Sequence, residues 1–265
     1  MNNLTFRTWQ PTHINYDGII ELAVSFLAAL LLFAGTYLPR FMPQYSELLS
    51  MISLSLLVVA FAYTYSEIMQ FSKKYISVIL ISLTGIAGLL LQEIYSQAGS
   101  IRYLAFVCIA AIFASFIIEI YKRNTYEFLA SFFTNVTGSA LVLGAPLYLS
   151  ASKLMESSDL LLFALSLLAC VNALKAIELD ATLNAIFTFA FISLVAIIMF
   201  ATMNRLPIHY AFAITLSIIV AQILLDYTFE GVNLHTYQSK IAFALIPAFI
   251  QGILLFVTAS LFMMY

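Results

Sequence analysis

The chain has 265 residues, of which 63% are hydrophobic and only 9% are charged, and its formal net charge is −2. Soluble domains contain about 25% charged residues, so this composition excludes a water-soluble globular protein. The basic residues form no continuous tract and no soluble nucleic-acid-binding module is present, which excludes nucleic acid as a partner. A mean hydropathy of +1.02 indicates a multi-pass protein of the cell membrane, with the lipid bilayer as its main partner.

Apolar runs of about the length needed to cross a bilayer follow one another along the chain. Their apolar residues are continuous rather than alternating, which favours helices over the strands of a membrane barrel. The predicted fold class is therefore all-α, a polytopic transmembrane helix bundle of about nine spans. These spans are predicted at residues 18–38, 48–69, 75–95, 101–121, 128–150, 160–174, 182–203, 208–227 and 241–264.

No connector is long enough for a second domain, so residues 1–265 are predicted to form a single integral membrane domain. Residues 1–17 are polar and lead into a full-length span, which is untypical of a cleavable signal peptide. Under the positive-inside rule, a nine-span chain places seven basic residues on the face of its N-terminus and four on the other. The seven are Arg7, Lys73, Lys74, Lys122, Arg123, Lys175 and Lys240, and the four are Arg40, Arg102, Lys153 and Arg205. We therefore expect the N-terminal segment 1–17 to be cytoplasmic and the C-terminus to lie outside.

No metal site is expected from the sequence. Cys108 and Cys170 lie inside apolar runs, and His13, His209 and His235 show no metal-ligand spacing. The sequence identifies no cofactor, because it contains neither a nucleotide-binding loop nor a catalytic motif of known spacing.

Carboxylates at the ends of spans are the first candidates for function, because ionisable groups inside a membrane are costly. Glu67 ends the second span, and Asp226 ends the eighth, four residues after Gln222. The structural alternative is that such side chains reach the head groups or pair with nearby basic residues. That alternative is favoured for Glu119, because Lys122 and Arg123 follow it at i+3 and i+4.

The fifth span holds the densest group of polar residues. They are Ser131, Thr134, Asn135, Thr137, Gly138 and Ser139. Asn135 lies near the middle of the span, where an unsatisfied amide costs several kcal/mol. Two roles are open for it: hydrogen bonding to a neighbouring helix, or forming the wall of a cavity for a polar substrate group. The sequence Gly-Ala-Pro at 144–146 predicts a kink or break near the end of the same span.

We predict that five polar residues line one cavity in the cytoplasmic half of the bundle. They are Glu67, Asn135, Asn172, Gln222 and Asp226. No catalytic role is assigned to any of them.

Two short strings carry a resemblance to a known family. Tyr65-Ser66-Glu67-Ile68 closes the second span with a Glu, and residues 221–226 (Ala-Gln-Ile-Leu-Leu-Asp) with Glu230 precede the last span. With its number of spans, this order resembles the CDP-diacylglycerol synthase (phosphatidate cytidylyltransferase) family. The chain also looks like a group of actinobacterial multi-span membrane proteins, in which a basic pair precedes a Ser/Thr/Gly-rich span, as residues 122–123 precede 136–138 here. The first resemblance implies a lipid substrate and a cytidylyl transfer assisted by two metal ions.

The chain departs from that enzyme family at its catalytic signatures. The family's Asn-Asp-Thr-Gly-Ala-Tyr segment falls near residues 171–175, where only Asn172 agrees and the metal-binding Asp is absent. The family's final Lys-Asp, His-Gly-Gly and Asp-Arg signature is absent from residues 235–246. We therefore expect no cytidylyl transfer by the family's mechanism, and the sequence leans away from an enzyme.

Three functions stay open. The first is handling of a lipid or lipid-linked metabolite in a cavity at the cytoplasmic leaflet. The second is a small permease or flippase, against which stands the shortage of ionisable residues in the middle of the spans. The third is a structural subunit of a membrane complex, whose fifth-span polar face binds partner membrane helices.

Overall fold

The computed structural model describes residues 16–68, 74–95, 100–122, 128–154, 158–174, 181–203, 208–228 and 236–263. Over these residues the chain is a bundle of helices without strands, which confirms the predicted all-α class. The first half comprises α1 (Tyr16–Thr36), η1 (Leu38–Arg40), η2 (Pro43–Tyr45), α2 (Ser46–Ile68), α3 (Lys74–Ile94), α4 (Ser100–Lys122) and α5 (Phe128–Val142). The second half comprises α6 (Gly144–Leu154), α7 (Ser158–Leu174), α8 (Ala181–Thr202), α9 (Ile208–Thr228) and α10 (Tyr237–Met263).

The helices have the length and composition of membrane spans. In the described part of the chain, 7 stretches are long and apolar enough to cross a membrane, and α5 with α6 counts as one of them. The apolar parts of α7 and α9, Asp159–Val171 and Ile208–Leu224, are shorter. Together these stretches account for the nine predicted spans, and the protein is a membrane protein on the strength of their apolar character.

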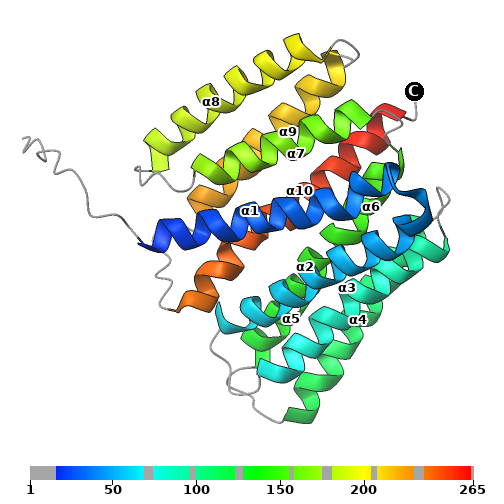
Figure 1. Cartoon of the computed structure of the whole chain (residues 1–265). Coiled ribbons are helices and arrows are strands. Elements are labelled where there is room, and N and C mark those ends of the chain that lie inside the picture. The colour runs from blue at the N-terminus through cyan, green and yellow to red at the C-terminus, as the bar shows by residue number, and fades with distance from the viewer. Residues whose placement is uncertain are drawn as a thin grey trace, which may run out of the picture.

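The bundle has two helical groups with a layer between them (Figure 1). One group contains α2, α3, α4 and α5, and the other contains α7, α8 and α9. Helices α1 and α10 lie between the groups, since α1 packs against both α2 and α7, and α10 packs against both α2 and α9. The outer helices are the least covered: 17% of the α8 span is buried, against 67% of the α10 span. Apolar side chains exposed on α8 are those expected to face lipid.

The fifth span is interrupted where the Gly-Ala-Pro sequence predicts a break. Helix α5 ends at Val142, Leu143 forms a turn, and α6 begins at Gly144. Pro146 lies in the first turn of α6, where its missing N–H removes no hydrogen bond of a regular helix start. The break therefore divides one predicted span into two helices, with α6 directed against α10.

Helices α6 and α10 cross in backbone contact. A Cβ atom added to Gly144 would lie 2.1 Å from the carbonyl oxygen of Phe249, and one added to Gly252 would lie 2.2 Å from the carbonyl oxygen of Gly144. Only glycine permits two helix backbones to approach so closely. Next to this crossing, the rings of Phe61 on α2 and Phe249 on α10 pack with their centroids 4.5 Å apart. The crossing thus joins α6 to the buried core of the bundle.

Candidate functional site

A polar cleft of about 420 Å³ opens at one end of the bundle, where α1, α3 and α6 end and α2 begins. This is the right-hand end in Figure 1, on the same side as the C-terminus. The cleft is lined by Thr36, Pro39, Arg40, Ser46, Ser50, Glu93, Leu149, Ser152 and Lys153. Its walls therefore combine two cationic side chains, one carboxylate and several hydroxyl groups from five separate elements.

The charged groups of the cleft are held in defined positions. Arg40 donates a hydrogen bond of 2.6 Å from Nη2 to the carbonyl oxygen of Ser152. Lys153 forms an ion pair with Glu93, with 2.8 Å between Nζ and Oε2. Arg40 is positioned by a short segment in which Pro39 is the second residue of η1 and Pro43 begins η2. Because proline fixes the backbone φ angle, these two turns fold the connector back over the end of the bundle.

The hydroxyl groups of the cleft are mostly committed to their own backbone. Thr36 donates to the carbonyl oxygen of Leu32 at 2.6 Å, and Ser152 donates to that of Leu149 at 2.8 Å. Each hydroxyl has one hydrogen to donate, so the hydrogens of Thr36 and Ser152 are already used in bonds to backbone carbonyl oxygens near the helix ends. Recognition of a ligand in the cleft would therefore rest on its charged side chains, which suit an anion such as a phosphate or carboxylate group.

Glu67 lies at the opposite end of the bundle from the cleft. Its carboxylate forms an ion pair with Lys74, which begins the next helix. The side chain of Lys74 is 36% exposed and that of Glu67 is 14% exposed. Sequence reasoning found no basic partner for Glu67 on its own helix, and the partner comes from the start of α3 instead.

The side chain of Asn135 on α5 is fully buried and forms a hydrogen bond with Glu119 on α4. Its Nδ2 donates to Glu119 Oε1 at 3.3 Å, and Ser131 Oγ donates to the same oxygen at 2.6 Å. Of the two roles open for Asn135, this geometry supports hydrogen bonding to a neighbouring helix. The sequence predicted Lys122 and Arg123 as local partners of Glu119, but the side chain of Lys122 and the whole of Arg123 lie outside the described residues.

The remaining predicted site residues lie in the second half of the chain. Gln222 is buried on α9, which packs against α7, α8 and α10. Asn172 lies on α7 and Asp226 on α9, but the side chains of both fall outside the described residues. Helix α5, which carries Asn135, packs against α2, α3 and α4 in the other helical group. Among the residues with described side chains, Glu67, Asn135 and Gln222 do not line the cleft, and the meeting of all five in one cavity stays a prediction.

Sequence reasoning treated Arg40 and Lys153 only as charges in connectors and assigned no role to Glu93, which lies near the end of the third predicted span. The one local signal was a basic residue enclosed by two prolines, at Pro39, Arg40 and Pro43. Glu93 and Lys153 are 60 residues apart in the chain and meet only through the packing of α3 against α6. Such a pairing has no signature in a single sequence.

Among the described residues, no three His, Cys, Asp or Glu side chains gather in a way that could hold a metal ion. No protein-family model, no curated protein and no solved structure matches this chain. The function is therefore argued from the site itself.

Proposed function

We propose that this membrane protein binds the anionic head group of a lipid or lipid-linked metabolite in the cleft that contains Arg40 and Lys153. The observation that carries the proposal is the convergence of these two cations on one cavity at the helix ends. Basic pockets between membrane helices at head-group level are typical binding sites for acidic lipids. The proposal keeps the lipid-handling function expected from the sequence but not its leaflet: the cleft lies at the end opposite Glu67, which the predicted topology puts outside rather than at the cytoplasmic leaflet.

The size and charge of the cleft support a small anionic group. Its volume of about 420 Å³ lies in the range of sites for small molecules. The cationic side chains of Arg40 and Lys153 line the cleft beside one carboxylate, that of Glu93, which favours a small anionic group such as a phosphodiester. A guanidinium has five N–H donors, of which the bond from Arg40 to Ser152 uses one. Lys153 would exchange its partner Glu93 for the ligand.

The test compares lipid head groups on the purified protein. Binding of phosphatidylglycerol and of phosphatidylcholine is measured by native mass spectrometry, with inorganic phosphate and glycerol phosphate as soluble competitors. We expect preference for the anionic lipid, and at least tenfold weaker binding in Arg40→Gln and Lys153→Gln. Lys74→Gln removes one positive charge at the opposite end and serves as the matched control.

Three outcomes would overturn the proposal. Equal binding of both lipids would show that the charge of the head group does not determine binding. Equal weakening in the Lys74→Gln control would point to a general effect of net charge. Competition by inorganic phosphate as strong as by the lipid would assign the cleft to a soluble anion instead.

A further inference from the structure

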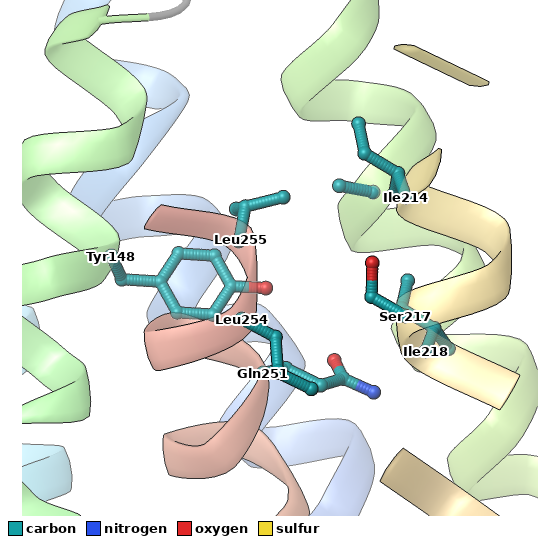
Figure 2. A pocket seen from close by; sticks show the side chains of 8 residues that line it. Tyr148, Ile214, Ser217, Ile218, Gln251, Leu254 and Leu255 are labelled. Carbon is teal, nitrogen blue, oxygen red and sulfur yellow. The ribbon is translucent and has the colours of Figure 1, made fainter. Parts of the chain in front are cut away.

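A second, small pocket lies between α6, α7, α9 and α10, separate from the charged cleft. Figure 2 shows Tyr148 of α6 directing its hydroxyl group across α10 toward α9, with Ser217 and Gln251 on the facing walls. The Tyr148 side chain is fully buried. Its position depends on Gly252, because a Cβ there would lie 2.8 Å from Tyr148 Cδ2. The glycine crossing of α6 and α10 thus seats the tyrosine ring against the backbone of α10.

Gln251 brings an unsatisfied acceptor to this pocket. Its side chain is only 4% exposed, and its Oε1 atom has no hydrogen-bond partner within the described part of the chain. A buried amide oxygen without a partner costs about 1–3 kcal/mol. Native structures satisfy the large majority of such groups, often through ordered water. Gln251 therefore requires a donor that the described residues do not supply.

Ser217 supplies another acceptor on the opposite wall. Its Oγ donates to the carbonyl oxygen of Ala213 and lies 3.3 Å from Thr258 Oγ1. The hydroxyl hydrogen of Thr258 is in turn placed on the carbonyl oxygen of Leu254. With its hydrogen directed along its own helix, Ser217 keeps lone pairs for a donor within the pocket.

The volume of the pocket limits the occupant to one small molecule. It measures about 10 Å³, which corresponds to about one water-sized sphere. The other lining residues are apolar, among them Ile214, Ile218 and Leu255. A lipid group, a nucleotide or a hydrated ion is too large for this space.

We propose that this pocket binds a single structural water molecule that joins α6, α9 and α10. The water donates its two hydrogens to Gln251 Oε1 and Ser217 Oγ and accepts a hydrogen from the Tyr148 hydroxyl. This set satisfies the amide oxygen and gives the buried tyrosine an acceptor. Three partners is the usual number for a buried water. The site is independent of the head-group cleft and does not rest on its function.

The direct test is an experimental structure of the full chain at a resolution that shows ordered water. We expect one density peak within hydrogen-bond distance of Tyr148 Oη, Gln251 Oε1 and Ser217 Oγ. A direct bond from Tyr148 Oη to Gln251 Oε1, a pocket without density, or density larger than one water would each overturn the proposal.

A double-mutant cycle gives a second test in solution. Tyr148→Phe and Gln251→Leu each remove one partner of the water, so combining them should change stability less than the sum of the two. We expect a tenfold departure from additivity in the unfolding equilibrium constant, about 1.4 kcal/mol. Tyr103→Phe, at a partly exposed tyrosine on α4, is the matched control and should add independently to Gln251→Leu. Additive behaviour of the Tyr148 and Gln251 changes would contradict the bridge.

Discussion

Replacing Gly144 by alanine should destabilise the bundle through the crossing of α6 and α10. The new Cβ would lie 2.1 Å from the carbonyl oxygen of Phe249, whereas ordinary contacts begin at 3.4 Å. The two backbones would have to separate by about 1.3 Å, the difference between these distances. The blocking atom belongs to a helix backbone and cannot rotate away as a side chain does. The fully buried side chains of Tyr148 and Phe249 would lose contacts as the helices part.

The expected loss of stability in Gly144→Ala follows from this close contact. Overpacking a buried site typically costs 1–3 kcal/mol, and a backbone clash belongs at the upper end, about 3 kcal/mol. Alanine gains at most about 1 kcal/mol over glycine in helix propensity. The free energy of unfolding should therefore fall by about 2 kcal/mol. Equilibrium unfolding of the purified protein in mixed detergent micelles measures this change.

Gly88→Ala is the matched control for this experiment. A Cβ at Gly88 would lie 3.0 Å from Pro146 Cγ and 3.1 Å from Leu143 Cδ2, which are side-chain atoms. A shift of a few tenths of an ångström relieves these contacts, and the gain in helix propensity offsets much of the cost. We expect a change within about 1 kcal/mol. If Gly144→Ala were as stable as Gly88→Ala, the close crossing of α6 and α10 would be refuted.

Four further outcomes are expected. Glu119→Ala should lower the free energy of unfolding by about 2 kcal/mol, because its two α5 donors lose a buried acceptor; an unchanged unfolding midpoint would contradict that cluster. Glu67→Gln should leave the midpoint unchanged, because its ion pair with Lys74 is partly exposed, and a large loss would show that the pair is structural. Reporter fusions at the two termini should report opposite faces of the membrane, with the N-terminus cytoplasmic, and the same face for both would exclude an odd number of spans. The purified protein with phosphatidate, CTP and Mg²⁺ should form no CDP-diacylglycerol, a prediction that robust turnover abolished by Asp226→Ala would disprove.

The spans were predictable because a bilayer imposes a length and an apolar composition on every helix that crosses it. The second span was predicted at 48–69 and forms α2 at Ser46–Ile68. The seventh span was predicted at 182–203 and forms α8 at Ala181–Thr202. The sixth span was predicted to end early, and α7 ends at Leu174. The interruption at Gly144 was also predictable, since glycine and proline act on the local backbone.

The inward face of each helix was not predictable in the same way. A soluble helix marks its buried side by an apolar stripe, but a membrane helix is apolar toward both lipid and protein. The sequence therefore gave no reason to pair Glu119 with α5 rather than with its own helical neighbours. The described partners of Glu119 are 12 and 16 residues away, on the far side of a connector. The cleft was even less predictable from the sequence, because its lining comes from five elements that meet only in the folded chain.

The two ends of the bundle use their charges differently, and this difference favours the cleft as the place to look for a ligand. At the Glu67 end, one carboxylate is neutralised by Lys74 and another, Glu119, is buried against donors from α5. At the other end, Arg40 and Lys153 line a cavity that has room for a further group. The buried Glu119 is costly to separate from its donors, whereas the Lys74–Glu67 and Lys153–Glu93 pairs are both partly exposed and can exchange. Of these two pairs, the Lys153–Glu93 pair lines the cleft. An anion arriving at head-group level at this end therefore meets a cavity with two cationic side chains, and one of them is held by an ion pair exposed enough to be replaced.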